Sequence, residues 1–397
     1  MRTKKNIKNS PIAWVYLMFS AGVLAEFLSL IISGGSFLTK MVFEIDYFPD
    51  YFNHIRRFYA DVPNVYMTDI DACFPPLAYL YYGALARILS CFQYADSSPL
   101  QTSASGILLI TMHTSLFALL FSFAMRRLSD QESALLTLLL FLSYPFWIAV
   151  ERGNMTEWVL ILLMYALALK DSKKAWQREL ALILFATAAA LKFYPAIFTL
   201  LYLMEKRWKE ADRLIVYAVI LFFLPFAAFD GVTGLRLFFG NITAVGSGYS
   251  GVTIAGIIGR IFILLGKSER LGHQIGRVLS LFYALIVLLL CRMNKSGTLW
   301  KKLALITSMM IVFVPECGSY CLFYWTIPFL SFMKHLRTKE MHKTAFSRSD
   351  KMYAFLFPLV FVSYPVHAFG SSGMLYLFLY LMLFILILDQ VFGLVKS

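Results

Sequence analysis

Residues 11–33 read PIAWVYLMFSAGVLAEFLSLIIS, and this apolar run decides the fold class. A helix needs about 20 mainly apolar residues to cross a bilayer, and several later runs are also long and apolar. The chain of 397 residues is 59% hydrophobic and only 15% charged, whereas soluble domains carry about 25% charged residues. Because the runs are continuous, helices are favoured over a β-barrel. The sequence therefore predicts an all-α, polytopic transmembrane helical bundle that forms a single domain over residues 1–397.

The positive charge of the chain follows the ends of these runs. The formal net charge is +13, and clustering at span ends is the pattern of the positive-inside rule. It favours membrane lipids over nucleic acid as partners. Arg2, Lys4, Lys5 and Lys8 predict a cytoplasmic N-terminus. The first run is too long for a signal-peptide core, so we expect a retained anchor in a multi-pass protein of the bacterial plasma membrane.

Counting the apolar runs between basic loops gives about twelve spans, with both ends cytoplasmic, plus re-entrant or interfacial helices. The run at residues 75–91 is the ambiguous one. If it crosses fully, Arg126 and Arg127 fall on the outer side, against the charge rule. We therefore expect it to lie in the outer interface or to re-enter there. Residues 230–251 are Gly-rich and predict a second outer loop, and 252–265 predict an interfacial or re-entrant segment.

The runs at residues 180–191 and 196–204 are too short for a full span of about 30 Å. Two explanations stay open. Either the bilayer is thinned there, or the helices break near Lys192 and their polar ends face a protein-lined cavity.

The longest polar interruption is an acidic loop at about residues 34–74. Residues 43–80 read FEIDYFPDYFNHIRRFYADVPNVYMTDIDACFPPLAYL, and six carboxylates face three cations between residues 40 and 71. Asp46 and Asp50 are four residues apart and would share a helix face, and aromatic neighbours favour their partial burial. One of them is a candidate general base for a sugar hydroxyl or a ligand for a divalent cation. His54 lies close by in sequence. The other aspartates are expected to be ordinary surface acids: Asp61, Asp69 and Asp71.

Arg152, Asn154 and Glu157 form a second candidate site beside an apolar run. Asn154 and Glu157 have the spacing of a helix cap with a capping box. That structural role does not explain Arg152, and an arginine beside a helix N-terminus is also suited to an anion.

Lys192 and Tyr194 form a third candidate, because a lysine at membrane depth is costly. It either snorkels to the headgroups or binds a phosphate. Arg260 is a further, interfacial candidate. Together, an acid, an Arg/Asn pair and a lysine on one face of the membrane suit a lipid phosphate that carries a sugar.

The five cysteines give no sign of a metal site. Cys317 and Cys321 are four residues apart, but a metal site needs more ligands nearby, and we expect small buried side chains. We expect no cofactor; a divalent metal is compatible with the chemistry but not required.

Three motifs follow the acidic loop in a fixed order: PPLAYLYY at residues 75–82, ERGNMTEW at 151–158 and LKFYP at 191–195. This order resembles the (F/Y)PPL, RGN and K-x-YP motifs of polytopic glycosyltransferases of the C superfamily (GT-C). The nearest branches are the bacterial glycosyltransferase family 87 and, more distantly, the GPI-anchor mannosyltransferase I family. The resemblance covers residues 43–207, and Phe74 stands where tyrosine is commoner.

The resemblance implies a polyprenyl-phosphate sugar donor, often of mannose, and inverting transfer to a hydroxyl of a lipid or glycan acceptor on the outer side. Asp50 matches the family's catalytic aspartate best, and Asp46 is the rival match. Lys192 would contact the donor phosphate. Arg152, Asn154 and Glu157 would line the donor or acceptor cavity.

Two alternatives use the same residues. A transporter or flippase of a lipid-linked or anionic substrate would move it without covalent change, although the inverted repeat of many transporters is not evident. A polysaccharide polymerase or ligase would share the substrate class, but such proteins place their large outer loop late in the chain.

Overall fold

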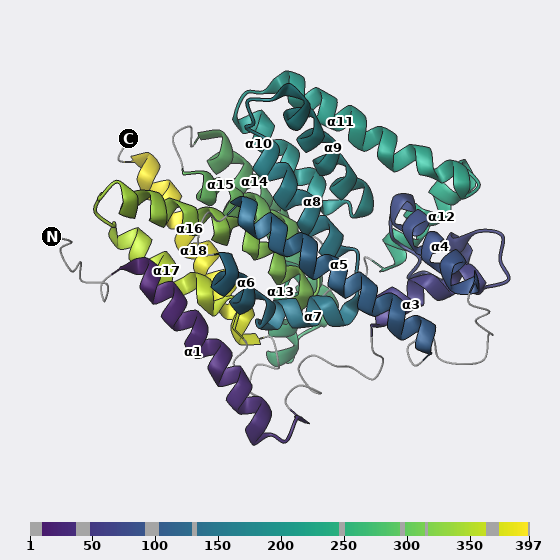
Figure 1. The fold of residues 1–397 in the computed structure, drawn as a ribbon, viewed down its shortest axis with the longest axis horizontal. Helices are drawn as coiled ribbons and strands as arrows, with labels where there is room; N and C mark the ends of the chain where they lie inside the picture. Colours follow the sequence, from purple (N-terminus) through teal and green to yellow (C-terminus); the bar gives the residue numbers. More distant parts are fainter. Residues whose placement is uncertain are drawn as a thin grey trace.

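The fold was analysed in a computed structural model, which describes residues 10–36, 48–91, 103–128, 133–245, 251–293, 298–313, 317–362 and 373–395. Within these ranges every regular element is an α-helix or a 3-10 helix (Figure 1). The predicted all-α class is therefore confirmed.

Five helices are long and apolar enough to cross a bilayer. They are α1 (Pro11–Ile32), α5 (Ala104–Leu128), α11 (Trp208–Phe223) continued by η6 (Leu224–Ala228), α14 (Glu269–Met293) and α18 (Gly373–Val395). A sixth candidate span is broken: α6 (Ser133–Phe141) and α7 (Tyr144–Arg152) meet at a bend of 64°. The chain is therefore an integral membrane protein with several spans.

The expected number of about twelve spans is not confirmed, because many apolar runs form helices too short to cross alone. The short α-helices are α8 (Thr156–Leu169), α9 (Ala175–Leu191), α10 (Thr199–Met204), α12 (Val232–Val245), α13 (Ile254–Leu264), α15 (Leu299–Val312), α16 (Thr326–Met341) and α17 (Arg348–Leu359). Two 3-10 helices, η5 (Tyr194–Phe198) and η7 (Ser319–Trp325), join helices inside the bundle. A rise of about 1.5 Å per residue leaves the 14 residues of α8 well short of a span.

The acidic loop folds into short helices packed on the bundle. They are α3 (Pro49–Arg56), η2 (Arg57–Tyr59) and η3 (Val65–Met67), followed by α4 (Pro76–Cys91). With 16 residues, α4 is too short to span alone, as the interfacial or re-entrant interpretation expects. In Figure 1, α3 and α4 lie on the opposite side of the molecule from both termini.

The loop expected at residues 230–251 is instead largely a helix, α12. The prediction was wrong because glycines were given more weight than the apolar residues between them. Phe238 of α12 is fully buried and its ring packs against Tyr66 of η3 at 5.6 Å. Asn241 donates to the carbonyl oxygens of Tyr66 and Ala72, both at 3.0 Å. α12 thus fixes the distal part of the acidic loop.

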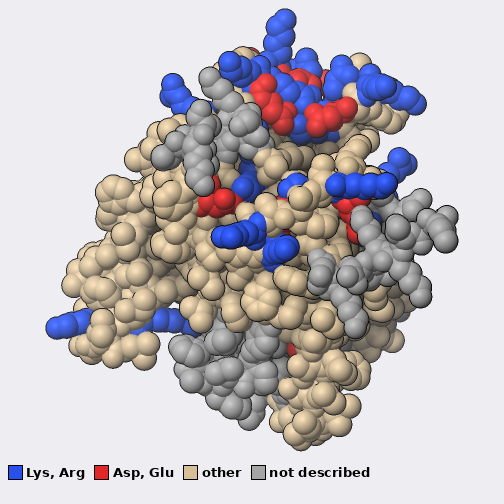
Figure 2. Space-filling view, turned by 90° about the vertical axis from the view of Figure 1, so that its left-hand side faces the viewer, with Lys and Arg blue, Asp and Glu red and all other residues tan. Residues whose placement is uncertain are grey.

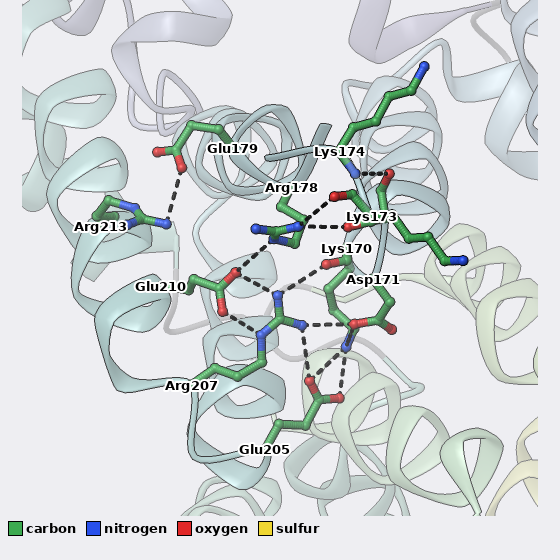
Figure 3. A network of polar contacts seen from close by, with 11 residues as sticks. Lys170, Asp171, Lys173, Lys174, Arg178, Glu179, Glu205, Arg207, Glu210 and Arg213 are labelled. Carbon is green, nitrogen blue, oxygen red and sulfur yellow. Dashed lines mark hydrogen bonds and ion pairs between the residues drawn. The ribbon is translucent and has the colours of Figure 1, made fainter. Parts of the chain in front are cut away.

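The basic loops predicted from the sequence form an ion-pair network at one end of the bundle (Figure 3). Lys170 after α8 donates to Glu205 after α10 at 2.7 and 2.8 Å. Arg207 bonds Asp171 at 2.8 Å and also pairs with Glu210. The network ties the α8–α9 turn to the α10–α11 turn. Figure 2 shows many Lys and Arg side chains gathered with Asp and Glu at the top of one face, with fewer charged side chains below.

α17 begins with a capping box whose carboxylate, Asp350, also binds two basic side chains of α16. Ser347 Oγ accepts the N–H of Asp350 at 3.0 Å, and Asp350 Oδ2 accepts the N–H of Ser347 at 2.8 Å. Lys339 Nζ donates to the same carboxylate at 2.6 Å, and His335 Nε2 lies 3.1 Å from Oδ1. Burial alone would raise the pKa of the Asp350 carboxyl, but hydrogen bonds from His335, Lys339 and Ser347 hold it well below its ordinary value.

We expect Asp350→Asn to lower the free energy of unfolding by about 2 kcal/mol, because charge-assisted hydrogen bonds to a buried carboxylate are lost. The folded-state pKa is depressed, so this stability is present above about pH 4 and is lost as the pH falls further. Thermal unfolding in detergent at pH 7 measures the effect. Asp61→Asn, at an exposed position, is the control, and equal melting temperatures of the two variants would contradict the assignment.

Candidate active site

α3 presents Asp50 at its N-terminal turn. Pro49 occupies the first helical position, and Phe48 before it has a positive φ of 52°, which sets the chain into the helix sharply. Proline is favoured at this position because its missing N–H is not needed. Tyr51 and Phe52 are fully buried, so they anchor the helix and leave the Asp50 carboxylate at its edge, 23% exposed.

Two residues from the turn after α7 hold the Asp50 carboxylate. Asn154 Nδ2 donates to Oδ2 at 2.6 Å, and Arg152 Nη1 lies 3.6 Å from Oδ1. Asn154 is almost fully buried, whereas Arg152 is 27% exposed. The structure therefore brings together three of the residues singled out from the sequence, although Asp50 lies 102 positions before Arg152 and 104 positions before Asn154.

Gly153 makes this turn possible. Its φ of +59° is in the left-handed region, and a Cβ atom there would lie 2.8 Å from Tyr51 Cβ. Its N–H closes α7 by bonding the carbonyls of Ala149 and Val150. The side-chain oxygen of Asn154 accepts the N–H of Thr156 at 3.2 Å, which orients the amide nitrogen towards Asp50. The RGN motif is thus a tight turn against α3.

The capping box expected between Asn154 and Glu157 is wrong. Glu157 is fully buried and its Oε2 lies 2.8 Å from His113 Nε2 on α5. Tyr81 OH lies 2.8 Å from the other ring nitrogen. The spacing to Asn154 therefore did not indicate the partner of Glu157, which is a polar group on a neighbouring helix.

His113 is a residue that the sequence reasoning missed. It lies in an apolar helix and is 4% exposed, and the Tyr51 ring packs against it at 4.8 Å. The signal that was overlooked is a lone histidine within a membrane-spanning run, which needs a polar partner.

Lys192 lies where α9 ends, so of the two explanations left open by the sequence, the structure shows the helix break. Its backbone is extended, with φ −145° and ψ 135°. The ammonium lies 3.8 Å from the centre of the Phe74 ring and within electrostatic range of Asp50. The side chain is 9% exposed, and no described residue accepts a hydrogen bond from it. Such a cation is suited to an anionic ligand.

Tyr194 lies next to this break and faces η7. Its hydroxyl is 3.3 Å from that of Tyr324, which donates to the Thr156 carbonyl at 3.1 Å. Tyr320 of η7 lies within electrostatic range of Asp50 and Arg152. η7 therefore forms a wall shared by the Asp50 and Lys192 sides, which the sequence did not indicate.

The remaining sequence candidates do not contact Asp50 in the part of the chain that the structure describes. Asp46 lies outside the described residues. His54 is buried, with Nδ1 3.2 Å from Tyr79 OH and its ring 4.0 Å from Phe74. Arg260 is exposed on α13 and packs over Gly251.

Cys317 and Cys321 are buried, as expected. The described residues contain no cluster of three or more metal-ligating side chains. That the chemistry needs no metal stays a prediction.

An apolar groove of about 530 Å³ lies next to the Asp50 site. Phe27 and Leu30 of α1, Phe117 of α5, and Trp147 of α7 line it together with Phe48 and Glu151. Phe48 directly precedes α3, and Glu151 directly precedes Arg152. The groove therefore brings an apolar surface from three membrane helices to the acid and its cation.

The model of glycosyltransferase family 87 matches residues 73–315, which is more than half of the chain. The chain belongs to glycosyltransferase family 87. No curated protein and no solved structure matches it. The matched region includes the RGN turn and Lys192, whereas Asp50 lies before it. In this family 87 glycosyltransferase, the structure itself therefore provides the link between Asp50 and the family region.

In this glycosyltransferase we expect Gly153→Ala to displace Asp50 from its contacts with Asn154 and Arg152. The added Cβ meets Tyr51 Cβ, so α3 must shift, and overpacking of this kind costs about 1–3 kcal/mol. Gly231→Ala is a matched control, because Gly231 also has a positive φ, of 54°, but no atom lies within 4 Å of the added Cβ. Thermal unfolding separates the two effects, and an equal loss in both variants would show that backbone strain alone is responsible.

His54 gives the enzyme a pH-dependent stability. Burial lowers the pKa of its imidazole well below the usual value, and the charges of Arg57 and Lys192 lower it further. Below about pH 6.5 the unfolded chain binds a proton that the folded chain does not. Stability therefore falls as the pH falls, by up to about 1.4 kcal/mol per pH unit.

We expect this slope between pH 6.5 and 5 to be smaller in His54→Gln, which does not titrate. The exposed His342→Gln should retain the wild-type slope. Melting temperatures measured across this pH range test the assignment, which fails if His54→Gln keeps the full slope.

Proposed function

We propose that this glycosyltransferase moves a hexose, mannose in the first instance, from a polyprenyl-phosphate sugar to a hydroxyl of a lipid or glycan acceptor, on the outer side of the membrane. The observation that carries the proposal is the Asp50 carboxylate, held by Asn154 and Arg152, close in sequence to Phe48 and Glu151, which line an apolar groove. An acid, a cation and a lipid-sized apolar surface meet there.

Asp50 serves as the general base. Its Oδ2 is occupied by Asn154 Nδ2 at 2.6 Å, which fixes the carboxylate plane. Among the described residues, Oδ1 has only the longer contact to Arg152, at 3.6 Å, so this oxygen is the one that receives the proton of the acceptor hydroxyl. A base held in one orientation places its lone pair without further loss of entropy.

Lys192 and Arg152 serve the leaving group. Lys192 is buried against Phe74 with no described hydrogen-bond acceptor, and Arg152 is partly exposed beside Asp50. A phosphate gains charge as it leaves, and preorganised cations stabilise that charge best where water is excluded. The groove along α1, α5 and α7 is suited to the first isoprene units of the donor.

The transfer is a single displacement. The acceptor oxygen forms a bond to the anomeric carbon, and the bond from that carbon to the phosphate oxygen breaks on the opposite side. The bonding electron pair leaves with the phosphate, and the hydroxyl proton passes to Asp50. The anomeric configuration is inverted, and the proposal assigns no metal.

The main alternative is a transporter or flippase of a lipid-linked or anionic substrate. It accounts for the cations and the groove, but it gives no role to a carboxylate with one oxygen held and one available. Membership of a glycosyltransferase family also favours the enzyme.

We expect Asp50→Asn to abolish transfer and Lys192→Met to reduce it at least tenfold, because each removes a group that acts on the transition state. Purified protein in liposomes is given radiolabelled polyprenyl-phosphate mannose and a lipid extract of the source cells, and labelled product is separated by chromatography. Asp71→Asn, in the exposed part of the loop, is the control.

Unchanged transfer by Asp50→Asn would exclude Asp50 as the base and leave Asp46 to be tested. Label that crosses the bilayer on its original lipid would support the flippase alternative.

A further inference from the structure

A second apolar groove, of about 460 Å³, lies near the start of α1, far from Asp50. Trp14 of α1, Phe355 of α17 and Ile385 of α18 line its walls, and Arg348 and Lys351 of α17 stand beside them. In Figure 1 these three helices run together on the side of the molecule that carries both termini. The groove has no part in the proposed glycosyl transfer.

The two cations of this groove share one face of α17. Arg348 and Lys351 are three residues apart, so their side chains are neighbours on the helix. Lys351 and Phe355 are four residues apart, so the lysine side chain is one helical turn from the aromatic ring on the same face of α17. Both cations are exposed, and neither has an ion pair among the described residues.

The nearest carboxylates are already engaged. Asp350 is held by Lys339 at 2.6 Å and by the capping box of α17. Asp389 of α18 accepts from Lys301 at 2.7 Å, from Ser349 at 3.0 Å and from Tyr353 at 3.2 Å. The groove therefore keeps a positive edge, because no carboxylate among the described residues lines it and both of these neighbouring carboxylates bind other cations.

The apolar residues next to Arg348 and Lys351 have the character of a surface that contacts lipid. Phe355 is 47% exposed and Trp14 is 36% exposed. Trp14 lies within the candidate span α1, and Phe355 lies on α17, which packs against the candidate spans α1 and α18. Tryptophan beside cations is typical of the membrane–water interface. A soluble anion would contact the cations but leave the apolar walls uncovered, whereas a phospholipid covers both.

We propose that this groove binds an anionic phospholipid of the surrounding bilayer. Its phosphate, whose charge is not offset by a cation in the headgroup, pairs with Arg348 and Lys351, and one acyl chain lies along Trp14, Phe355 and Ile385. A zwitterionic lipid binds with a smaller electrostatic gain, since the cation of its headgroup is repelled by Arg348 and Lys351.

A photocrosslinker within the groove tests the proposal locally. The full-length protein carries p-benzoylphenylalanine in place of Phe355 and is reconstituted in phosphatidylcholine vesicles with a trace of radiolabelled phosphatidylglycerol or radiolabelled phosphatidylcholine. After illumination, we expect at least fivefold more label from phosphatidylglycerol. We expect Arg348→Gln with Lys351→Gln to remove the preference and keep phosphatidylcholine labelling unchanged, which also shows that the groove is intact.

The matched control is Lys173→Gln with Lys174→Gln, which removes two exposed adjacent cations from the turn before α9. This variant should keep the preference. Equal labelling by the two lipids in the parent protein, or a preference that survives the Arg348 and Lys351 substitutions, would overturn the proposal. Both readouts are independent of sugar transfer, so a failed transfer assay does not affect them.

Discussion

The hydrogen bond from Asn154 to Asp50 joins the acidic loop to the membrane helices. It is 2.6 Å long and connects residues 104 positions apart. Gly153 allows the approach, since only a residue without Cβ fits against Tyr51. Tyr51 in turn packs on His113, which is held by Glu157. The position of the acid thus depends on packing that begins two helices away, and an error in any of these contacts would move the carboxylate.

Broken helices are the second feature of the site. The α6–α7 bend, the turn at Gly153 and the end of α9 at Lys192 all interrupt apolar segments. A break within a membrane leaves backbone groups that need partners. Here Gly153 N–H bonds two α7 carbonyls, and the Thr156 carbonyl accepts from Tyr324. The protein therefore satisfies the backbone internally and gains polar side chains at a depth that straight helices do not provide.

The sequence predicted much of this arrangement, for identifiable reasons. Three features could be inferred from short stretches of sequence. The length of an apolar run indicated the first span, and a lysine before FYP indicated the break at Lys192. Polar residues beside apolar runs indicated the grouping of Asp50 with Arg152 and Asn154. The number of spans did not follow, because hydropathy does not show whether a run is straight. The α6–α7 bend and α12 depend on packing between distant segments, such as Phe238 against Tyr66. The partner of Glu157 was missed for the same reason, since His113 is 44 positions away.

Lys192 is the buried cation that the proposed mechanism uses to stabilise the leaving phosphate. The fold places its ammonium over Phe74 and leaves it with no described hydrogen-bond acceptor, so part of its lost hydration is not replaced. In the proposed transfer, the phosphate of the donor supplies the missing partner. Its charge grows as the sugar departs, so the interaction strengthens along the reaction coordinate. Interactions that are stronger in the transition state than in the ground state are the ones that accelerate a reaction. A cation already engaged with an internal carboxylate, as Lys170 is with Glu205, would have to lose that partner first. The absence of such a partner among the described neighbours of Lys192 is therefore what makes it suitable for a leaving phosphate.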